Sequence, residues 1–492
     1  MKQISIHIEN LKVKQQGNVV LDGVSFDLLP GQHLAITGAS GSGKTSLAKA
    51  ITGHLFHQGN VIVKEKNSDN APFVLFVEHR NEFKNLSNQS NFYYQQRYNS
   101  TESEDALTVV QELNAYFEKV LPNKEHSASI AFWLRRIGLK HRSNTPLIQL
   151  SNGEHKRLQL IKALMLQPDV LIMDQPFTGL DVQSRDIVSK IFDEVSENTM
   201  LIMIPGHEEL PSCIAYVAEL ENGTLKQFCS KDQYKKAEDK KQPFIIPDTL
   251  STLENSLEFS SAVYMNNVSI HYDEKIIFEN VNWNVQKGEK WQVKGANGSG
   301  KSTLLSLMNG DNPQAYANEI YLFDKKRGTG ESIWDIKRKI GYVSPELHWY
   351  FDKTISVFET IASGFFDTMR LYRRLSEEQE TLIAKWLAVF NLSEQAFKLL
   401  SNLSVSQQRL VMLIRALIKN PALLILDEPC QGLDDQQTAD FVYLIDHFCQ
   451  DKTLIYVSHY DHEVPSCINK KLELKEGKAT ITILEKKEKA VA

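Results

Sequence analysis

Residues 38–45 read GASGSGKT, and residues 295–302 read GANGSGKS. Both stretches fit the pattern G-x-x-x-x-G-K-[ST], and each lies between a strand-like apolar segment and a helix-like segment. Glycines in such a loop let the backbone curl so that its N–H groups and the N-terminus of the next helix surround a phosphate group. The lysine reaches the β- and γ-phosphate oxygens, and the hydroxyl residue after it binds Mg²⁺. The sequence therefore predicts two sites for a nucleoside triphosphate with Mg²⁺.

Each loop supplies its own set of candidate ligands. The glycines and the residues of the first helical turn are expected to hold the phosphates, and the hydroxyls of Thr45 and Ser302 are also expected to bind the metal ion. A chance glycine-rich turn is the alternative, but it does not explain two copies in the same context. The candidates are Gly38, Ser40, Gly41, Gly43, Lys44, Thr45 and Ser46 in the first loop, and Gly295, Asn297, Gly298, Gly300, Lys301, Ser302 and Thr303 in the second.

The loops are part of an internal repeat. Residues 20–46 match residues 277–303, and each copy reads as strand, turn, strand, glycine-rich loop and helix. Further on, residues 168–181 (PDVLIMDQPFTGLD) match residues 421–434 (PALLILDEPCQGLD). Two separate motifs in the same order indicate that a whole domain has been duplicated.

The repeat sets the expected domain boundaries. A length of 492 residues favours two or three domains. We assign residues 1–233 to a first nucleotide-binding domain and residues 259–492 to a second. Residues 234–258 are charged and then rich in Pro, Ser and Thr, which is typical of a linker.

Composition excludes several classes of protein. Hydrophobic residues make up 42% of the chain, which is enough for packed cores. A formal net charge of −6 argues against a broad basic face for nucleic acid, so nucleic acid is not expected as a partner. No apolar run is long enough to cross a membrane, and the first residues do not resemble an export signal. The five cysteines show no C-x-x-C spacing and fit a reduced cytosolic protein.

The pattern of apolar residues predicts an α/β fold. Runs of β-branched residues alternate with helical patterns at both ends of each half, which favours a parallel sheet. Between the glycine-rich loop and the later apolar strand, residues 102–160 and 357–418 are predicted to be helical. Each half is therefore expected to hold a helical subdomain inserted in a nucleotide-binding core.

Two apolar strands end in a carboxylate. Asp174 closes the first and Asp427 the second, where a buried strand would deliver the side chain toward Mg²⁺ at the edge of the sheet. Glu428 follows Asp427 and could polarise the attacking water, whereas Gln175 follows Asp174 and has no comparable base. Loss of a general base costs roughly 10²–10⁴ in rate.

With these motifs the chain resembles the ATP-binding cassette (ABC) ATPases, which add an LSGGQ signature before the Asp-bearing strand and a switch histidine after it. LSNGE at 150–154 is close to that signature, and LSVSQ at 403–407 is less close. His207 and His459 are at the switch position. The resemblance implies that the substrate is ATP. It also implies that Ser151, Gly153, Glu154, Ser404, Ser406, Gln407, Asp174, Gln175, Asp427 and His207 contact nucleotide and that Glu428 and His459 are catalytic.

The resemblance further implies two tandem P-loop NTPase domains, each with a RecA-like core, an antiparallel β subdomain and an inserted helical subdomain, packed head to tail as an intramolecular pseudo-dimer. Each ATP then lies between the P-loop of one domain and the signature of the other. Under that arrangement Gln175 and Ser406, which replaces a signature glycine, fall in the same composite site. The second site combines Glu428 with the near-consensus signature of the first half.

The adenine contact follows the same division. Tyr272 occupies the position at which the family stacks an aromatic ring on adenine, and Gln15 occupies it in the first half. Stacking of a base on an aromatic ring is worth about 1–3 kcal/mol. The sequence therefore predicts one competent site and one degenerate site, although chance drift could also place such defects together.

The Q-loop, which in this family couples ATP to a partner, departs in both copies. His79 and Pro345 stand where the family has Gln, with Glu78 and Glu346 beside them. Glu346 is a candidate to assist Mg²⁺. The departures put the usual coupling to a transporter in doubt.

Within the family, the chain most resembles the duplicated soluble ATPases named ModF or PhrA. SNFYYQQRYNS from Ser90, GFFDTMRLYRRLSEEQ from Gly364, YVSPELH from Tyr342 and LDEPCQGLD from Leu426 carry this resemblance. It implies ATP hydrolysis in the cytoplasm or, with a permease as partner, at the inner face of the cytoplasmic membrane. An energy-coupling subunit of a transporter is the first hypothesis, and a soluble ATPase acting on a ribosome, nucleic acid or protein complex is the alternative. A non-hydrolysing scaffold or sensor is a third, which Glu428 argues against.

Overall fold

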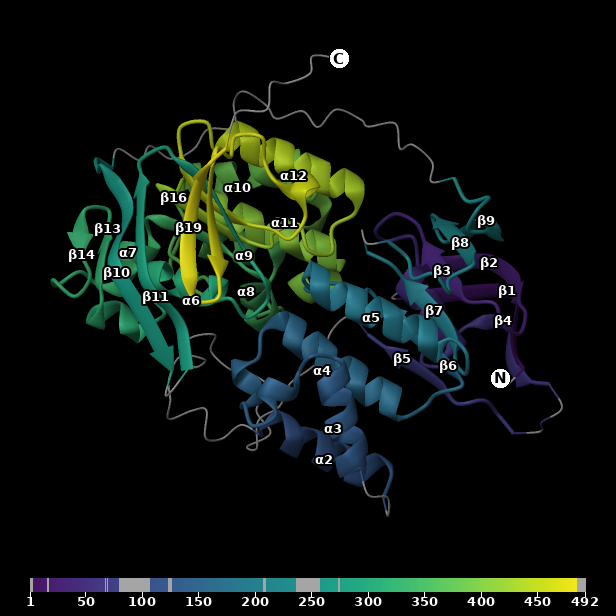
Figure 1. The fold of residues 1–492 in the computed structure, drawn as a ribbon. Coiled ribbons are helices and arrows are strands. Elements are labelled where there is room, and N and C mark those ends of the chain that lie inside the picture. The colour runs from purple at the N-terminus through teal and green to yellow at the C-terminus, as the bar shows by residue number, and fades with distance from the viewer. Residues whose placement is uncertain are drawn as a thin grey trace. The chain divides into compact units, whose positions relative to one another are not determined.

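The computed structural model describes residues 3–15, 17–66, 68, 70–78, 107–122, 126–206, 209–235, 257–272 and 275–484. The described residues up to 235 form one compact unit, and those from 257 onward form a second (Figure 1). Each unit has its own sheets and its own hydrophobic cores.

The first unit contains two sheets. An antiparallel sheet has the strand order β2-β1-β4, and a larger sheet has the order β5-β6-β7-β3-β8-β9. In the larger sheet the strands from β5 to β8 run parallel, and β9 pairs antiparallel with β8. The strands are β1 (Ile4–Gln15), β2 (Asn18–Leu28), β3 (Leu34–Thr37), β4 (Gln58–Glu65), β5 (Val74–Val77), β6 (Val170–Asp174), β7 (Met200–Ile204), β8 (Tyr216–Glu221) and β9 (Thr224–Ser230).

The helices of the first unit follow the predicted order. The P-loop helix comes directly after β3, and the helical subdomain separates β5 from β6. The helices are α1 (Lys44–Ile51), α2 (Val109–Val120), α3 (Ser127–Arg136), α4 (Asn152–Met165) and α5 (Val182–Val195), with single 3₁₀ turns at Lys140–Arg142 and Leu147–Gln149.

The second unit repeats this plan. Its antiparallel sheet has the order β11-β10-β13-β14, and its larger sheet has the order β15-β16-β17-β12-β18-β19. The strands are β10 (Ser261–Tyr272), β11 (Lys275–Gln286), β12 (Lys290–Gly295), β13 (Glu319–Leu322), β14 (Lys325–Lys326), β15 (Ile340–Val343), β16 (Leu423–Asp427), β17 (Thr453–Val457), β18 (Lys470–Lys475) and β19 (Lys478–Ile483).

The helices of the second unit are α6 (Lys301–Asn309), α7 (Ile333–Lys337), α8 (Pro345–Tyr350), α9 (Val357–Ser363), α10 (Glu377–Val389), α11 (Val405–Leu417) and α12 (Asp435–Phe448). Single 3₁₀ turns lie at Pro313–Ala317, Ser393–Gln395, Leu400–Asn402 and Asp461–Glu463. The α/β fold predicted from sequence, with an antiparallel subdomain and a helical insertion in each half, is confirmed. The head-to-tail packing of the halves stays a prediction.

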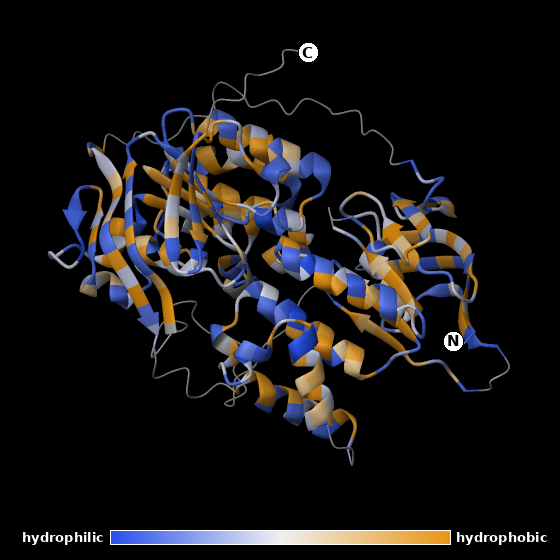
Figure 2. Ribbon diagram, in the orientation of Figure 1, coloured by the Kyte–Doolittle hydropathy of each residue, from blue (hydrophilic) through white to orange (hydrophobic). Residues whose placement is uncertain are grey.

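Hydropathy explains which sheet lies in the core. Every residue of β6, β7, β16 and β17 is buried, as expected of parallel strands covered on both faces. Strands β1 and β10 instead alternate between buried and more exposed residues, so only one face of each antiparallel sheet packs on the core. Figure 2 shows this contrast as largely hydrophobic central strands beside strands of mixed colour.

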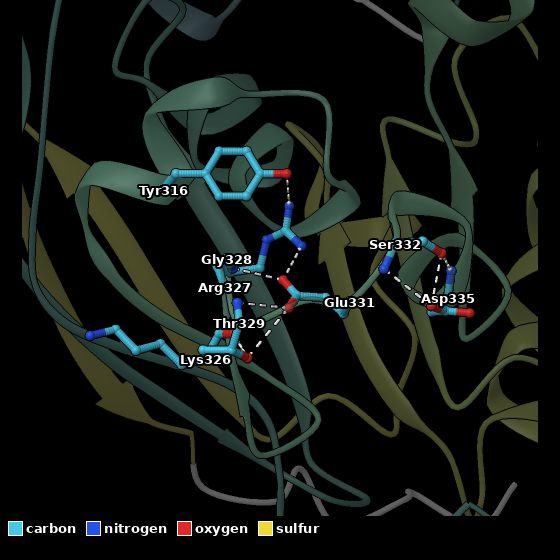
Figure 3. A network of polar contacts seen from close by, with 8 residues as sticks. All are labelled: Tyr316, Lys326, Arg327, Gly328, Thr329, Glu331, Ser332 and Asp335. Carbon is cyan, nitrogen blue, oxygen red and sulfur yellow. Dashed lines mark hydrogen bonds and ion pairs between the residues drawn. The ribbon is translucent and has the colours of Figure 1, made fainter.

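One loop distinguishes the second unit from the first. Between β14 and α7, the side chain of Glu331 accepts hydrogen bonds from the buried guanidinium of Arg327 at 2.8 Å and from the backbone N–H groups of Gly328 and Thr329 at 2.8 and 3.1 Å (Figure 3). Arg327 also donates to the Tyr316 hydroxyl at 3.3 Å. In the first unit, β4 leads to β5 through residues 66–73, whose described members form no helix.

The ends of the predicted linker are packed on the units. The Tyr234 side chain contacts the core of the first unit, and its hydroxyl accepts a hydrogen bond from Thr37 at 3.4 Å. Leu257 packs against the core of the second unit. No helix in the described part of the chain is both long enough and apolar enough to cross a membrane.

Candidate functional site

The P-loop of the first unit begins where β3 ends and closes at the start of α1. Gly43 precedes α1 with a φ of 101°, a backbone conformation that residues other than glycine rarely adopt. At Gly38 an added Cβ would lie 2.2 Å from the backbone oxygen of Leu220. The backbone conformation therefore requires glycine at both ends of this loop. Because neither position carries a side chain, the curl stays open for a phosphate.

The two P-loop lysines are held inside their own loops. The ammonium of Lys44 donates to the backbone oxygens of Gly38 and Ala39, each at 2.7 Å. Lys301 makes the equivalent bonds to Gly295 and Ala296 at 2.8 and 3.0 Å. Each lysine thus places its charge at the centre of the curl, where a phosphate oxygen would be its preferred partner.

The other P-loop candidates occupy matching positions in both units. Ser40, Gly41, Asn297 and Gly298 lie in the turn before the helix, and Thr45, Ser46, Ser302 and Thr303 lie in its first turn.

The first unit brings its two candidate metal ligands together. The hydroxyl of Thr45 donates to Oδ2 of Asp174 at 2.8 Å. Burial raises the pKa of Asp174, and the Thr45 hydrogen bond with the nearby cations Lys156 and Lys44 opposes that rise only in part. A hydroxyl and a buried carboxylate side by side are the oxygen donors that Mg²⁺ takes in nucleotide sites. The residues present therefore fit a magnesium ion.

The second unit holds a carboxylate and an imidazole in contact. Asp427 is the buried last residue of β16, and Glu428 follows it with a φ of 45°. Oε1 of Glu428 lies 2.9 Å from Nε2 of His459. Burial raises the pKa of Glu428, but the adjacent His459, together with the charges of Lys301 and Arg409, outweighs it and leaves the pKa below its ordinary value. Glu428 is therefore held as a carboxylate next to the P-loop lysine.

Gln175 in the first unit has the same backbone conformation as Glu428 but carries an amide in place of the carboxylate. Gln175 has a φ of 48°, and its N–H donates to the backbone oxygen of Ile204 at 2.8 Å, just as Glu428 donates to Val457 at 3.0 Å. The side-chain oxygen of Gln175 accepts a hydrogen bond of 3.5 Å from Thr178. The same left-handed backbone thus presents a carboxylate in the second unit and an amide in the first.

The strand register reveals a further difference that the sequence reading missed. Asp174 pairs with Ile204, and Asp427 pairs with Val457. His459 is thus the second residue after its strand position, whereas the second residue after Ile204 is Gly206. His207 itself lies outside the described residues, but it comes one position later along the chain. A comparison of the two strands by register would have found this shift.

The signature segments start helices α4 and α11. Ser151 accepts a hydrogen bond from the N–H of Glu154 at 3.3 Å, and the Glu154 side chain accepts from the N–H of Ser151 at 2.8 Å. These reciprocal bonds form a capping box. The carboxylate of Glu154 also accepts from Arg142 at 2.6 Å. Burial raises the pKa of Glu154, and Arg142 with Ser151 more than offsets the rise, so the pKa lies below its ordinary value.

The signature of the second unit is capped in the same way but with an added hydroxyl. Ser404 and Gln407 form the capping box of α11. Ser406, where the first unit has Gly153, is buried, and its hydroxyl lies 3.1 Å from that of Ser404. The hydroxyl that the family implies for phosphate contact is therefore engaged by its neighbour in this unit.

The candidate adenine position carries a different residue in each unit. Tyr272 ends β10, and its hydroxyl accepts a hydrogen bond from the buried amide of Asn312 at 3.1 Å. Asn312 donates in turn to Ser306 of the P-loop helix at 3.1 Å. Gln15, the last residue of β1, is exposed. A fixed aromatic ring is thus present beside the P-loop helix in the second unit.

The Q-loop positions carry no glutamine in either unit. Pro345 opens α8, whose N-cap Ser344 accepts a hydrogen bond from Leu347 at 3.1 Å. Glu346 is buried at the start of this helix. In the first unit Glu78 forms an ion pair with Lys49 at 2.9 Å, and His79 lies outside the described residues.

Two buried cations near these sites were also missed from the sequence. Lys156 on α4 donates to the backbone oxygen of Asp174 at 3.3 Å. Arg409, the fifth residue after Ser404, donates to the side-chain oxygen of Gln431 at 2.7 Å. Both cations are the fifth residue after the N-cap serine of their helix, so alignment of the two signatures could have identified them.

Comparison with known proteins identifies the family. The family model for the ABC transporter matches residues 21–178 and 278–431. The chain is 31% identical to the ABC transporter ATP-binding protein ModF of Escherichia coli K12, over 90% of this chain and 91% of that one. It is 30% identical to an uncharacterised ABC transporter ATP-binding protein of Schizosaccharomyces pombe, over 93% and 95%.

A solved structure shares the tandem fold. The archaeal ribosome recycling factor aABCE1, crystallised with the ribosomal stalk protein aP1, matches 94% of this chain and 87% of its own with a TM-score of 0.53 and 17% identity. That likeness concerns the fold, and the matched domains together with the relatives establish the activity. The chain belongs to the ABC transporter family of ATP-binding proteins and is an ATPase with two tandem ABC domains.

Proposed function

We propose that this tandem ATPase hydrolyses ATP at one competent composite site, built from the P-loop of residues 259–492 and the signature of residues 1–233, which residues 234–258 link. The observation that carries the proposal is the Glu428 carboxylate, 2.9 Å from His459 on a backbone that presents Gln175 in the first unit. A deprotonated carboxylate beside the P-loop can accept the proton of an attacking water.

Each site residue of the second unit has a separate role in this proposal. Lys301 contacts the γ-phosphate from within its loop, and Tyr272 stacks on adenine. Glu428 orients the water and takes its proton, while His459 holds the Glu428 carboxylate in place. Bound Mg²⁺, for which Ser302 and Asp427 are the candidate ligands, would neutralise charge on the phosphates.

The first P-loop, in this proposal, retains ATP with little hydrolysis. Lys44, Thr45 and Asp174 keep the phosphate and metal contacts. Gln175 is no proton acceptor, and Ser406 engages the Ser404 hydroxyl that would contact the γ-phosphate of this ATP in the head-to-tail arrangement. The two ATP molecules would then serve different purposes, one for closure and one for turnover.

We further propose that this cycle energises a membrane transporter from the cytoplasmic side, with a separate permease as partner. The relatives named as ABC transporter ATP-binding proteins support this role. A soluble target is the second candidate. Pro345 favours it, because a helix-opening proline replaces the glutamine of the coupling loop.

The experiment that separates the two roles is a pull-down with the Glu428→Gln protein locked by ATP. The variant is incubated with native membranes and with cytosol, and the bound proteins are identified. Lys301→Ala, which should not lock, is the matched control. A polytopic membrane protein captured only by the locked form supports the transporter role. Ribosomes, nucleic acid or soluble protein captured instead would overturn it and support the soluble role.

A further inference from the structure

The segment that carries the catalytic base is held at three points. The N–H of Glu428 donates to Val457 of β17 at 3.0 Å. The thiol of buried Cys430 lies 3.4 Å from the Tyr456 hydroxyl. The side chain of Gln431 accepts from Arg409 at 2.7 Å. The first two contacts come from the strand beside Asp427, and the third comes from the signature helix α11.

Arg409 lies in a buried position that is energetically unfavourable for a cation. Its side chain is 6% exposed, and burial of a cation is unfavourable unless it is hydrogen-bonded and close to negative charge. Gln431 provides the hydrogen bond, and the turn from Glu428 to Gln431 is closed by a backbone bond of 3.2 Å between them. A buried cation is thus directed at the turn that begins with the catalytic base.

The first unit offers a natural comparison. At the equivalent position Lys156, also buried at 7% exposure, donates to the backbone oxygen of Asp174. Thr178 replaces Gln431, and its hydroxyl contacts Gln175. In the unit that has Glu428, the buried cation thus bonds to the last residue of the turn. In the first unit, Lys156 bonds instead to the residue before the turn.

We propose that Arg409 is a positioning residue for ATP hydrolysis, which fixes the Glu428–Gln431 turn through Gln431 so that the catalytic carboxylate faces the attacking water. The inference rests on the proposed role of Glu428. A misplacement of about 1 Å in a reacting group can cost about 10² in rate. A loss of the clamp should accordingly lower kcat and leave the affinity for ATP nearly intact.

The test is steady-state and single-turnover ATP hydrolysis by the full chain. Arg409→Gln is expected to lower kcat about 10-fold or more with KM for ATP changed less than about threefold. Arg409→Lys should recover part of the loss, because an ammonium also donates to an amide oxygen. Arg374→Gln, on the surface, is the matched control and should behave as the native protein.

Two combinations distinguish positioning from general damage. Gln431→Ala should reproduce the loss, and its combination with Arg409→Gln should cost little more than either change alone. In a Glu428→Gln background, Arg409→Gln should have almost no further effect on single-turnover hydrolysis. Gln431→Ala keeps the test valid if Arg409→Gln fails to fold.

The outcomes distinguish the role of Arg409 from the proposed function of Glu428. Normal kcat in folded Arg409→Gln, or a loss that adds in full to that of Glu428→Gln, would overturn the role of Arg409. Near-native turnover by Glu428→Gln itself, measured in the same series, would overturn the proposed function on which that role depends.

Discussion

Two turns, called here the first and second corners, follow Asp174 and Asp427. They have nearly the same backbone and different side-chain chemistry. Gln175 and Glu428 both follow a buried Asp, both have a left-handed φ, and both donate their N–H to the neighbouring strand. Only Glu428 offers a carboxylate, and it lies 2.9 Å from a histidine. A duplicated turn can thus keep its backbone while an amide replaces the carboxylate, because packing preserves the backbone and does not require the carboxylate.

Replacement of the base should therefore give the largest difference between the halves. Glu428→Gln makes the second corner chemically equal to the first, and we expect steady-state ATPase activity to fall by at least about 10² while ATP still binds. Gln175→Ala should change activity less than about threefold. Phosphate release and equilibrium binding of labelled ATP, measured on both variants, provide the check. Comparable losses from the two changes would mean that both corners hydrolyse.

The P-loop lysines sharpen the comparison at the next level. Lys301→Ala removes the proposed γ-phosphate contact at the proposed competent site, and we expect turnover to fall by about 10². In the proposed function, Lys44→Ala affects an ATP that is retained and not hydrolysed, so turnover should fall by less than about 10-fold with weaker closure. ATP retained after rapid gel filtration reports closure. Complete loss of hydrolysis in Lys44→Ala with ATP still retained at the second site would contradict this division.

Repair of the first corner should succeed only in part. Gln175→Glu restores a carboxylate, but Ser406 still engages Ser404 and the switch histidine is one position farther from its strand, so turnover should rise less than about twofold. Combination with Ser406→Gly should raise it further. The control is Ser406→Gly alone. Doubled turnover in Gln175→Glu alone would show that neither of the other two departures matters.

The fold could be predicted from sequence because each half repeats strong local signals. The two G-x-x-x-x-G-K-[ST] loops, the apolar strands that end in Asp174 and Asp427, and the helical patterns between them all agree with the structure. Local geometry requires glycine at positions 38 and 43, so the sequence motif is enough to predict the shape of the loop.

Contacts between distant segments were not predictable in the same way. The bond from Arg409 to Gln431, the hold of Asn312 on Tyr272 and the ion pair from Arg142 to Glu154 depend on which surfaces meet after folding. The shift of His207 relative to His459 required the strand register, since a motif search accepts either spacing. Tertiary packing, which no local pattern encodes, decides these features.

The smallest expected effect concerns the two signature helices. Glu154→Ala removes a capping-box side chain from α4 and leaves Arg142, which is 14% exposed, without this partner. We expect a local destabilisation of about 2 kcal/mol. Gln407→Ala removes only the cap of α11 and should cost about 1 kcal/mol. Amide hydrogen exchange should then accelerate about 30-fold in α4 and about fivefold in α11. The same substitution at exposed Glu118 is the control. Equal acceleration in the two helices would mean that the Arg142 ion pair adds nothing, and that the two signatures differ only in the residues that face nucleotide.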